Sequence, residues 1–161
     1  YEWNPEKSGK PTTTKINMKG DPSKRRIKTY KKPNKTEYRG LVTSRVGQGY
    51  YRQEILKKWN NKCGVTGVNI KEILISSHII PWSKSNKDER LDVENGILLS
   101  PNIDSLFDRH LISFKDSGEI IISKKLSSPD LDRLGVNNYM KLSHVTNGMK
   151  PFLSRHRKNL Q

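Results

Sequence analysis

Four polar side chains in the middle of the chain have the types and spacing that hydrolytic chemistry requires. His78 follows an apolar run, Asn95 begins the next one, and Asp104 and Asp108 come after it, four residues apart. Residues four apart on a helix share a face, so these two carboxylates would lie one turn apart and repel each other. A hard divalent cation relieves this repulsion, because Mg²⁺ takes one or two carboxylates and completes its shell with water and phosphate oxygens. Together the four residues offer a base, a group that orients the base and a Lewis acid, the set that hydrolysis of a phosphodiester needs.

Each residue also has a structural interpretation when it is considered alone. A histidine at the end of an apolar strand is often a hydrogen-bonded core residue, and Asp104 could be solvated while Asp108 caps a neighbouring segment. The combination within one short stretch is what favours a functional site.

The elements that must position these residues are two strands, a loop and a helix. The apolar, β-branched run at 72–82 predicts a strand that delivers His78 near its end and stops at a proline. A polar loop at 83–94 separates it from a second strand at 95–100. A serine followed by a proline then predicts the N-cap and first position of a helix over about 101–109.

Flanking segments complete the expected domain. Tyr51, Ile55 and Trp59 are spaced four apart, which predicts a helix whose stripe packs into the core. Cys63 is expected to be a small buried residue. The other predicted elements are a short strand and turn at 63–67, a hairpin at 111–123, a short helix from Ser128 and a last helix at 152–160.

The charge of the chain points to a polyanionic partner. The 161 residues include 31 Lys and Arg against 16 Asp and Glu, a net charge of +15. Residues 1–40 hold twelve of the basic residues, four acidic ones and four prolines, with few aliphatic side chains. We therefore expect an extended or disordered basic arm, in which Lys24, Arg25 and Arg26 contact phosphates. The alternative is a solvated tail without a role.

Composition also excludes several classes of protein. No apolar run is long enough to span a membrane, and the N-terminus has no apolar signal region. Acidic lipid is a weaker candidate than nucleic acid, because the basic stretches are interrupted by Pro, Gly and Thr. The single cysteine excludes an internal disulfide and a multi-cysteine zinc cluster, and suggests a reducing compartment. The absence of an initiator methionine at Tyr1 suggests an excised fragment.

At these residues the sequence resembles the HNH nucleases of the ββα-metal fold. The resemblance spans about 41–160 and is closest to the branch found in restriction-type and other defence endonucleases. It is carried by Ser77–Trp82, Asp92–Pro101 and Asp104–Ser113, with support from Arg45–Arg52, Cys63–Gly67 and Phe152–Arg157.

The resemblance implies a role for each residue of the motif. His78 corresponds to the general base, Asn95 to the residue that holds the loop and the base, and Asp104 and Asp108 to ligands of one divalent cation. Ser77 stands where many relatives have a further metal ligand, so water would complete more of the shell. Carboxylate ligands favour Mg²⁺ or Mn²⁺ over Zn²⁺.

The expected fold is therefore α+β. It has a ββα-metal core at about 72–110 inside a nuclease domain at 41–161, flanking helices, an extra β-hairpin and the basic arm at 1–40. The expected function is hydrolysis of double-stranded DNA in restriction or anti-phage defence, in the cytoplasm of a bacterium. Besides the three arm residues, the expected DNA contacts are Arg45, Arg52, Lys84, Lys87, Arg90 and Arg109.

Other interpretations stay open on the sequence alone. The same composition suits a catalytically inactive basic DNA-binding module or an RNA-directed toxin nuclease. A homodimer and a recognition domain fused upstream of Tyr1 are also compatible with the sequence.

Overall fold

The computed structural model describes residues 45–161, with the side chains of residues 45 and 46 left out. The basic arm expected at 1–40 lies outside the described residues. The elements are, in chain order, α2 (Arg45–Lys58), β1 (Ile75–His78), the 3-10 turns η2 (Trp82–Lys84) and η3 (Val93–Asn95), β2 (Gly96–Leu99), α3 (Pro101–Asp108), β3 (Ile112–Phe114), β4 (Ile120–Ile122), α4 (Ser128–Leu134) and α5 (Met149–Arg157).

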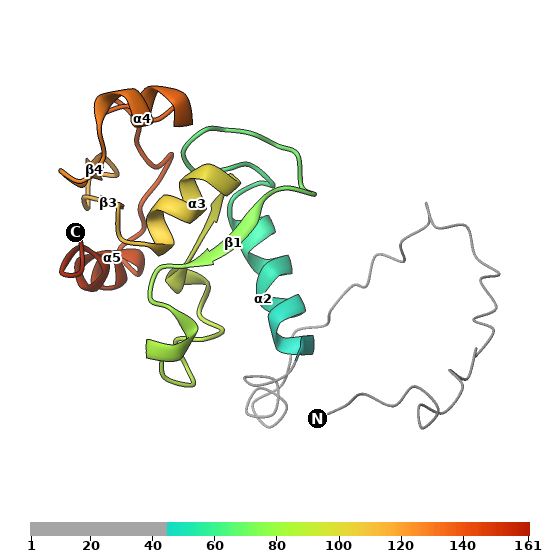
Figure 1. Cartoon of the computed structure of the whole chain (residues 1–161). Coiled ribbons are helices and arrows are strands. Elements are labelled where there is room, and N and C mark those ends of the chain that lie inside the picture. The colour runs from blue at the N-terminus through green and yellow to red at the C-terminus, as the bar shows by residue number, and fades with distance from the viewer. Residues whose placement is uncertain (1–44) are drawn as a thin grey trace, which may run out of the picture.

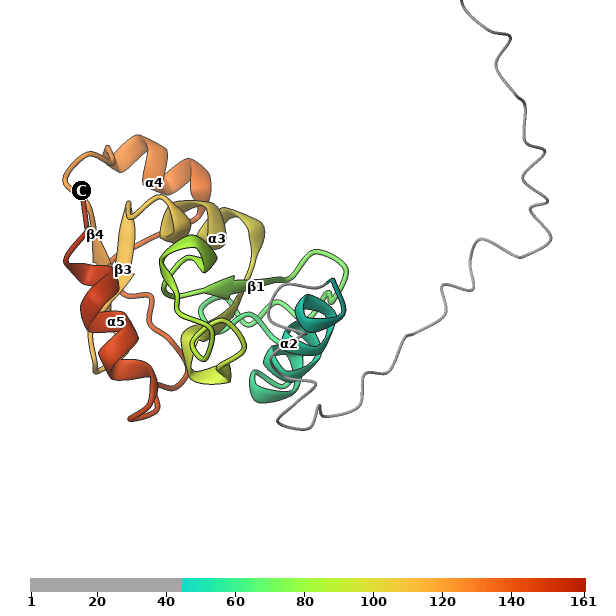
Figure 2. The same cartoon turned by 90° about the horizontal axis from the view of Figure 1, so that it is seen from below.

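Strands β1 and β2 form an antiparallel pair that α2 and α3 both contact. The register pairs Ile75 with Leu99 and His78 with Gly96, so the histidine lies opposite the first residue of β2. Both views show α2 on one side of β1 and α3 on the other (Figures 1 and 2). The strand that carries His78 is therefore held between two helices.

The predicted stripe of α2 is confirmed as core. Tyr51, Ile55 and Trp59 are all buried. The helix gives way to two residues in the left-handed region, Asn60 at φ 51° and Asn61 at φ 56°. Asparagine tolerates this conformation better than most residues, so the chain can reverse here toward the buried Cys63.

The β2–α3 connection also follows the sequence signals. All four residues of β2 are buried. Ser100 has extended dihedrals and precedes Pro101 at the first helical position, where the missing N–H removes no helical hydrogen bond. The apolar face of α3, Ile103, Leu106 and Phe107, then packs into the core.

The C-terminal half adds a second sheet on the α3 side of the molecule (Figure 2). The predicted hairpin is confirmed: β3 and β4 pair antiparallel. Its turn contains Gly118 at φ 88°, a conformation that a β-carbon would disfavour. Helix α5 contacts β3 and contributes buried Met149, Phe152 and Leu153.

Three predicted boundaries were wrong. The first strand covers only residues 75–78, because 71–73 form a turn and the chain bends again at 79–80. Residues 63–67 form a turn with no strand. The last helix is Met149–Arg157, three residues earlier in the chain than the predicted 152–160.

Taken together, the described part of the chain combines helices with two small antiparallel sheets, compatible with an α+β HNH-like core. Within residues 45–161, none of the helices has the length and apolar character needed to cross a bilayer.

Candidate active site

His78 is the last residue of β1, and its half-buried ring is fixed on three sides. The Tyr51 ring stacks on it with centroids 4.1 Å apart and an interplanar angle of 9°. Trp82 meets it edge-on at 5.7 Å. Its Nε2 lies 2.9 Å from the carbonyl oxygen of Arg90. Because a carbonyl only accepts hydrogen bonds, Nε2 carries the proton, and Nδ1 is left with the lone pair of the neutral ring.

The environment also keeps this ring neutral. Burial lowers the pKa of His78 below its ordinary value of 6.5, and the hydrogen bond to the Arg90 carbonyl offsets only part of that effect. The neutral imidazole, the form that accepts a proton, therefore dominates at pH 7.

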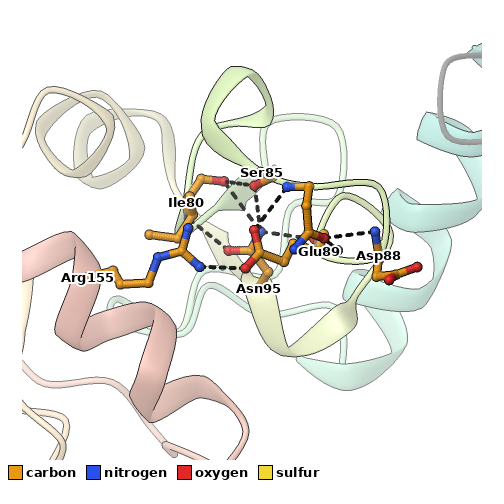
Figure 3. A network of polar contacts seen from close by, with 7 residues as sticks. Ile80, Ser85, Asp88, Glu89, Asn95 and Arg155 are labelled. Carbon is orange, nitrogen blue, oxygen red and sulfur yellow. Dashed lines mark hydrogen bonds and ion pairs between the residues drawn. The ribbon is translucent and has the colours of Figure 1, made fainter.

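Asn95 is fully buried and ties both ends of the β1–β2 loop together (Figure 3). Its Oδ1 accepts a hydrogen bond from the Ile80 N–H at 2.8 Å. Its Nδ2 donates to the Glu89 carbonyl at 3.0 Å and to Ser85 Oγ at 3.2 Å, with a longer contact of 3.4 Å to the Ile80 carbonyl. One amide side chain thereby fixes the start, middle and end of the loop.

This network leads directly to the histidine. The Glu89 carbonyl that accepts from Asn95 is one residue before the Arg90 carbonyl that accepts from His78. The Tyr51 hydroxyl donates to the Asn95 carbonyl at 2.9 Å, so the ring that stacks on His78 is itself anchored to Asn95.

Helix α5 holds the same loop from outside. Arg155 pairs with Glu89 at 2.5 Å, across 66 residues of sequence (Figure 3). The hydrogen bond from Arg155 is the main reason that the pKa of Glu89 is lowered. The loop is thus clamped by a buried amide on one side and an ion pair on the other.

The acidic pair lies on α3. Asp104 is half-buried in its first turn, and Asp108 is exposed at its last residue. Burial raises the pKa of Asp104, and the charge of Asp108 raises it further, whereas a hydrogen bond from Ser77 lowers it. An acidic residue at a helix C-terminus is unfavourable by itself, because the helix dipole is negative there.

The donor set fits a hard cation with few protein ligands. Two carboxylates close enough to perturb each other match the one or two that Mg²⁺ uses. Across residues 45–161, His, Cys, Asp and Glu form no cluster of three or more that could hold a metal ion. Water and substrate oxygens would therefore complete the shell.

Adjacent residues of β1 connect the two parts of the site. Ser77 is buried and hydrogen-bonds to Asp104 of α3, whereas the His78 ring lies on Tyr51 of α2. Two consecutive residues of β1 therefore contact opposite helices: Ser77 contacts the acidic pair on α3, and His78 contacts α2.

The basic residues predicted to contact DNA differ in their settings. Arg52 donates to the carbonyls of Leu74 and Lys71, at 2.7 and 2.9 Å. Arg90 lies over the Trp82 ring at 5.1 Å, and its Nε donates to the Trp82 carbonyl. These two side chains are fixed in place by the protein itself.

The other predicted contacts are exposed or not described. Lys84, Lys87 and Arg109 are exposed. Lys84 lies close enough to His110, just after α3, to contribute to lowering its pKa, after burial. The side chain of Arg45 and the residues Lys24, Arg25 and Arg26 lie outside what the structure describes.

Sequence reasoning missed three contributors to the site. Tyr51 was assigned to the core, and nothing in a helical stripe distinguishes a tyrosine that also stacks on a histidine. The Arg155–Glu89 pair had no local signal, because its partners are far apart in sequence. His110 has φ 55° and a buried Nδ1 without a hydrogen-bond partner among the described residues, and only its position two residues after Asp108 could have drawn attention to it.

Comparison with known proteins agrees with this arrangement. A family model described as HNH endonuclease matches residues 63–115, the stretch that contains His78, Asn95, Asp104 and Asp108. A search of curated proteins gives no match. Residues 63–115 are thus similar to the HNH endonuclease family, in line with the motif.

Proposed function

We propose that the chain is a metal-dependent endonuclease that hydrolyses phosphodiester bonds in double-stranded DNA. The observation that carries the proposal is the state of His78, whose ring is oriented by a carbonyl at Nε2 and kept neutral by burial. The match of residues 63–115 to the HNH endonucleases supports nuclease activity and DNA binding.

His78 would act as the general base. Its Nδ1 lone pair accepts a proton from a water molecule as that water attacks phosphorus. The hydrogen bond at Nε2 prevents the ring from turning and stabilises the imidazolium that forms. Asn95 acts indirectly, by fixing the loop that supplies the Arg90 carbonyl.

Asp104 and Asp108 would hold one Mg²⁺ or Mn²⁺. Bound there, the cation would neutralise charge on the scissile phosphate and stabilise the leaving 3′ oxygen. Ser77 keeps Asp104 oriented through its hydroxyl group. Direct displacement at phosphorus needs the attacking and leaving oxygens on opposite sides, so the base on β1 and the carboxylates on α3 would act on opposite sides of the scissile phosphate. The resemblance to HNH nucleases implies products with a 5′-phosphate and a 3′-hydroxyl.

Exposed cations around the acidic pair would hold the duplex. Lys84, Lys87 and Arg109 lie on the loop and just after α3, where they can meet phosphates on either side of the cut. The basic arm would add contacts that are independent of sequence. A role in restriction or anti-phage defence, inside a bacterial cell, is part of the proposal.

The test is cleavage of supercoiled plasmid and of structured RNA, each with Mg²⁺, Mn²⁺ or EDTA. We expect metal-dependent nicking of the plasmid, and a loss of about 10² to 10⁴-fold in His78→Ala with DNA affinity unchanged. His144→Ala is the matched control, because His144 is exposed and packs on Trp59. Wild-type activity in His78→Ala, or cleavage of RNA alone, contradicts the proposal.

A further inference from the structure

A pocket of about 320 Å³ lies beside His78, between α2 and β1. Ser77, on the other face of β1, hydrogen-bonds to Asp104 of α3, and neither residue lines this pocket, so it is separate from the acidic pair. Of the residues that line this pocket, the proposed mechanism gives a chemical role only to His78. The pocket is lined by Gln48, Tyr51, Arg52, Ser76, His78 and Trp82.

Ser76 gives the first indication of what the pocket holds. Its Oγ is shielded from solvent and has no hydrogen-bond partner within the described part of the chain. A buried hydroxyl without a partner is costly, and most such groups in native proteins are satisfied. Ser76 also lines the pocket, and a serine hydroxyl can both donate and accept, so a ligand there could supply the missing partner.

Arg52 gives the second indication. Two of its N–H groups donate to the Leu74 and Lys71 carbonyls, which fixes the guanidinium at the pocket wall. It forms no ion pair with a carboxylate among residues 45–161, so its positive charge is not compensated there. A fixed, uncompensated cation next to an unpartnered hydroxyl favours an anion with acceptor oxygens.

The size and walls of the pocket specify the anion further. The aromatic rings of Tyr51 and Trp82 provide apolar surface, which a lone phosphate would not use. The volume exceeds what a phosphate group needs and leaves room for a sugar. A phosphodiester with its deoxyribose satisfies both the polar and the apolar parts.

We propose that this pocket binds the phosphate and sugar of the nucleotide next to the scissile phosphate. The assignment rests on the proposed nuclease function, since it takes His78 as the base that faces the scissile group. The phosphate accepts from Ser76 and lies near Arg52, and the sugar packs on Trp82. Such contacts fix the register of the strand and carry no sequence preference.

The experiment uses the full chain and short duplexes cut at a mapped position. A neutral methylphosphonate replaces the phosphate on either side of the scissile one, in separate duplexes, and an abasic site replaces the adjoining base in a third. Ser76→Ala is the informative variant, because its hydroxyl has no partner in the protein to lose. Ser154→Ala, an exposed hydroxyl on α5, is the matched control.

We expect one of the two methylphosphonates to slow wild-type cleavage about ten-fold, the effect of losing one charge-assisted contact. Ser76→Ala should cut the unmodified duplex about ten-fold more slowly, mainly through KM, and lose most of the methylphosphonate penalty. Ser154→Ala should behave as wild type.

Three outcomes overturn the assignment. If neither methylphosphonate matters, or if the penalty is unchanged in Ser76→Ala, the pocket does not hold that phosphate. If only the abasic site matters, the pocket holds a base. If wild type cuts no DNA at all, the nuclease proposal fails first, and fluorescence anisotropy with the same duplexes in EDTA still decides whether the Ser76-dependent contact exists.

Discussion

Asn95→Ala should separate the role of the loop clamp from that of the base. The change removes every side-chain hydrogen bond of Asn95 and leaves the Ile80 N–H without a partner at a buried position. The Ile80 carbonyl keeps a bond from Ser85 Oγ at 2.9 Å, and the half-buried Glu89 carbonyl can turn to water. The expected loss is therefore dominated by one orphaned donor.

The magnitude follows from these contacts. An orphaned buried donor costs about 1 to 3 kcal/mol, and each further lost bond costs about 0.5 to 1.5 kcal/mol. With two good Nδ2 bonds also lost, Asn95→Ala should destabilise the fold by about 3 kcal/mol. For a domain of this size that lowers Tm by about 10 °C.

Activity should fall by more than stability explains. Without Asn95 the Glu89–Arg90 segment is free to move, so the carbonyl that holds His78 Nε2 is no longer fixed. At a temperature where the variant is fully folded, kcat should drop about 10²-fold with KM little changed, because orientation of the base acts in the transition state.

Thermal melting and plasmid cleavage, measured on the same samples, check both parts. Ser85→Ala is the matched control: it removes two loop bonds, one from Ser85 Oγ to the Ile80 carbonyl and one from Asn95 Nδ2 to Ser85 Oγ, but leaves Asn95 holding Ile80 and Glu89. We therefore expect a loss of about 2 kcal/mol and nearly normal cleavage. If Asn95→Ala has the Tm of wild type and cuts at the wild-type rate, the hydrogen bonds of Asn95 to the loop have no influence on the base.

Further outcomes test the metal, the arm and the C-terminal helix. Saturating Mn²⁺ should raise the Tm of wild type, since a ligand at 100 times its Kd stabilises by about 2.7 kcal/mol, and Asp104→Asn should lose this rise; an equal rise in both refutes the site. Deleting residues 1–40 should reduce the slope of log affinity against log salt by about 0.9 per lost phosphate contact, with the cleavage position unchanged. Burial lowers the pKa of His156 from 6.5 to about 4, so as the pH falls the unfolded chain takes up the proton before the folded protein does. The contribution of this neutral ring to the free energy of unfolding is therefore fully present above pH 6.5. It should fall by about 3 kcal/mol as the pH drops to about 4. Urea unfolding at several pH values measures that loss, and a flat profile contradicts the burial of a neutral ring.

Elements with a local signal were predictable from the sequence. The stripe of Tyr51, Ile55 and Trp59 reflects helical periodicity alone, and the serine and proline before α3 act through their own backbone preferences. The hairpin at β3–β4 follows from a turn that needs a glycine. These features depend on residues within a few positions of one another.

Features that depend on distant contacts were not predictable. Periodicity does not say that the ring of His78 lies toward α2 while Ser77 turns to α3, because both helices must first dock on β1. The true length of β1 depends on where the paired strand β2 begins, opposite His78. The residue roles taken from the motif remain predictions until the variants are measured.

The packing around β2 bears on how far the nuclease segment could be moved between proteins. A β-carbon at Gly96 would collide with Tyr51 and Ile55, and one at Gly64 with Trp59, so α2 and the residue that follows it fit directly onto this part of the matched segment. On the other side, His156 of α5 stacks on Phe107 at 3.9 Å. A graft of residues 63–115 into another scaffold would expose both surfaces to water. A fragment that folds in another protein must therefore include α2 and α5. Transfer of residues 63–115 between unrelated proteins should succeed only when both helices are transferred with them.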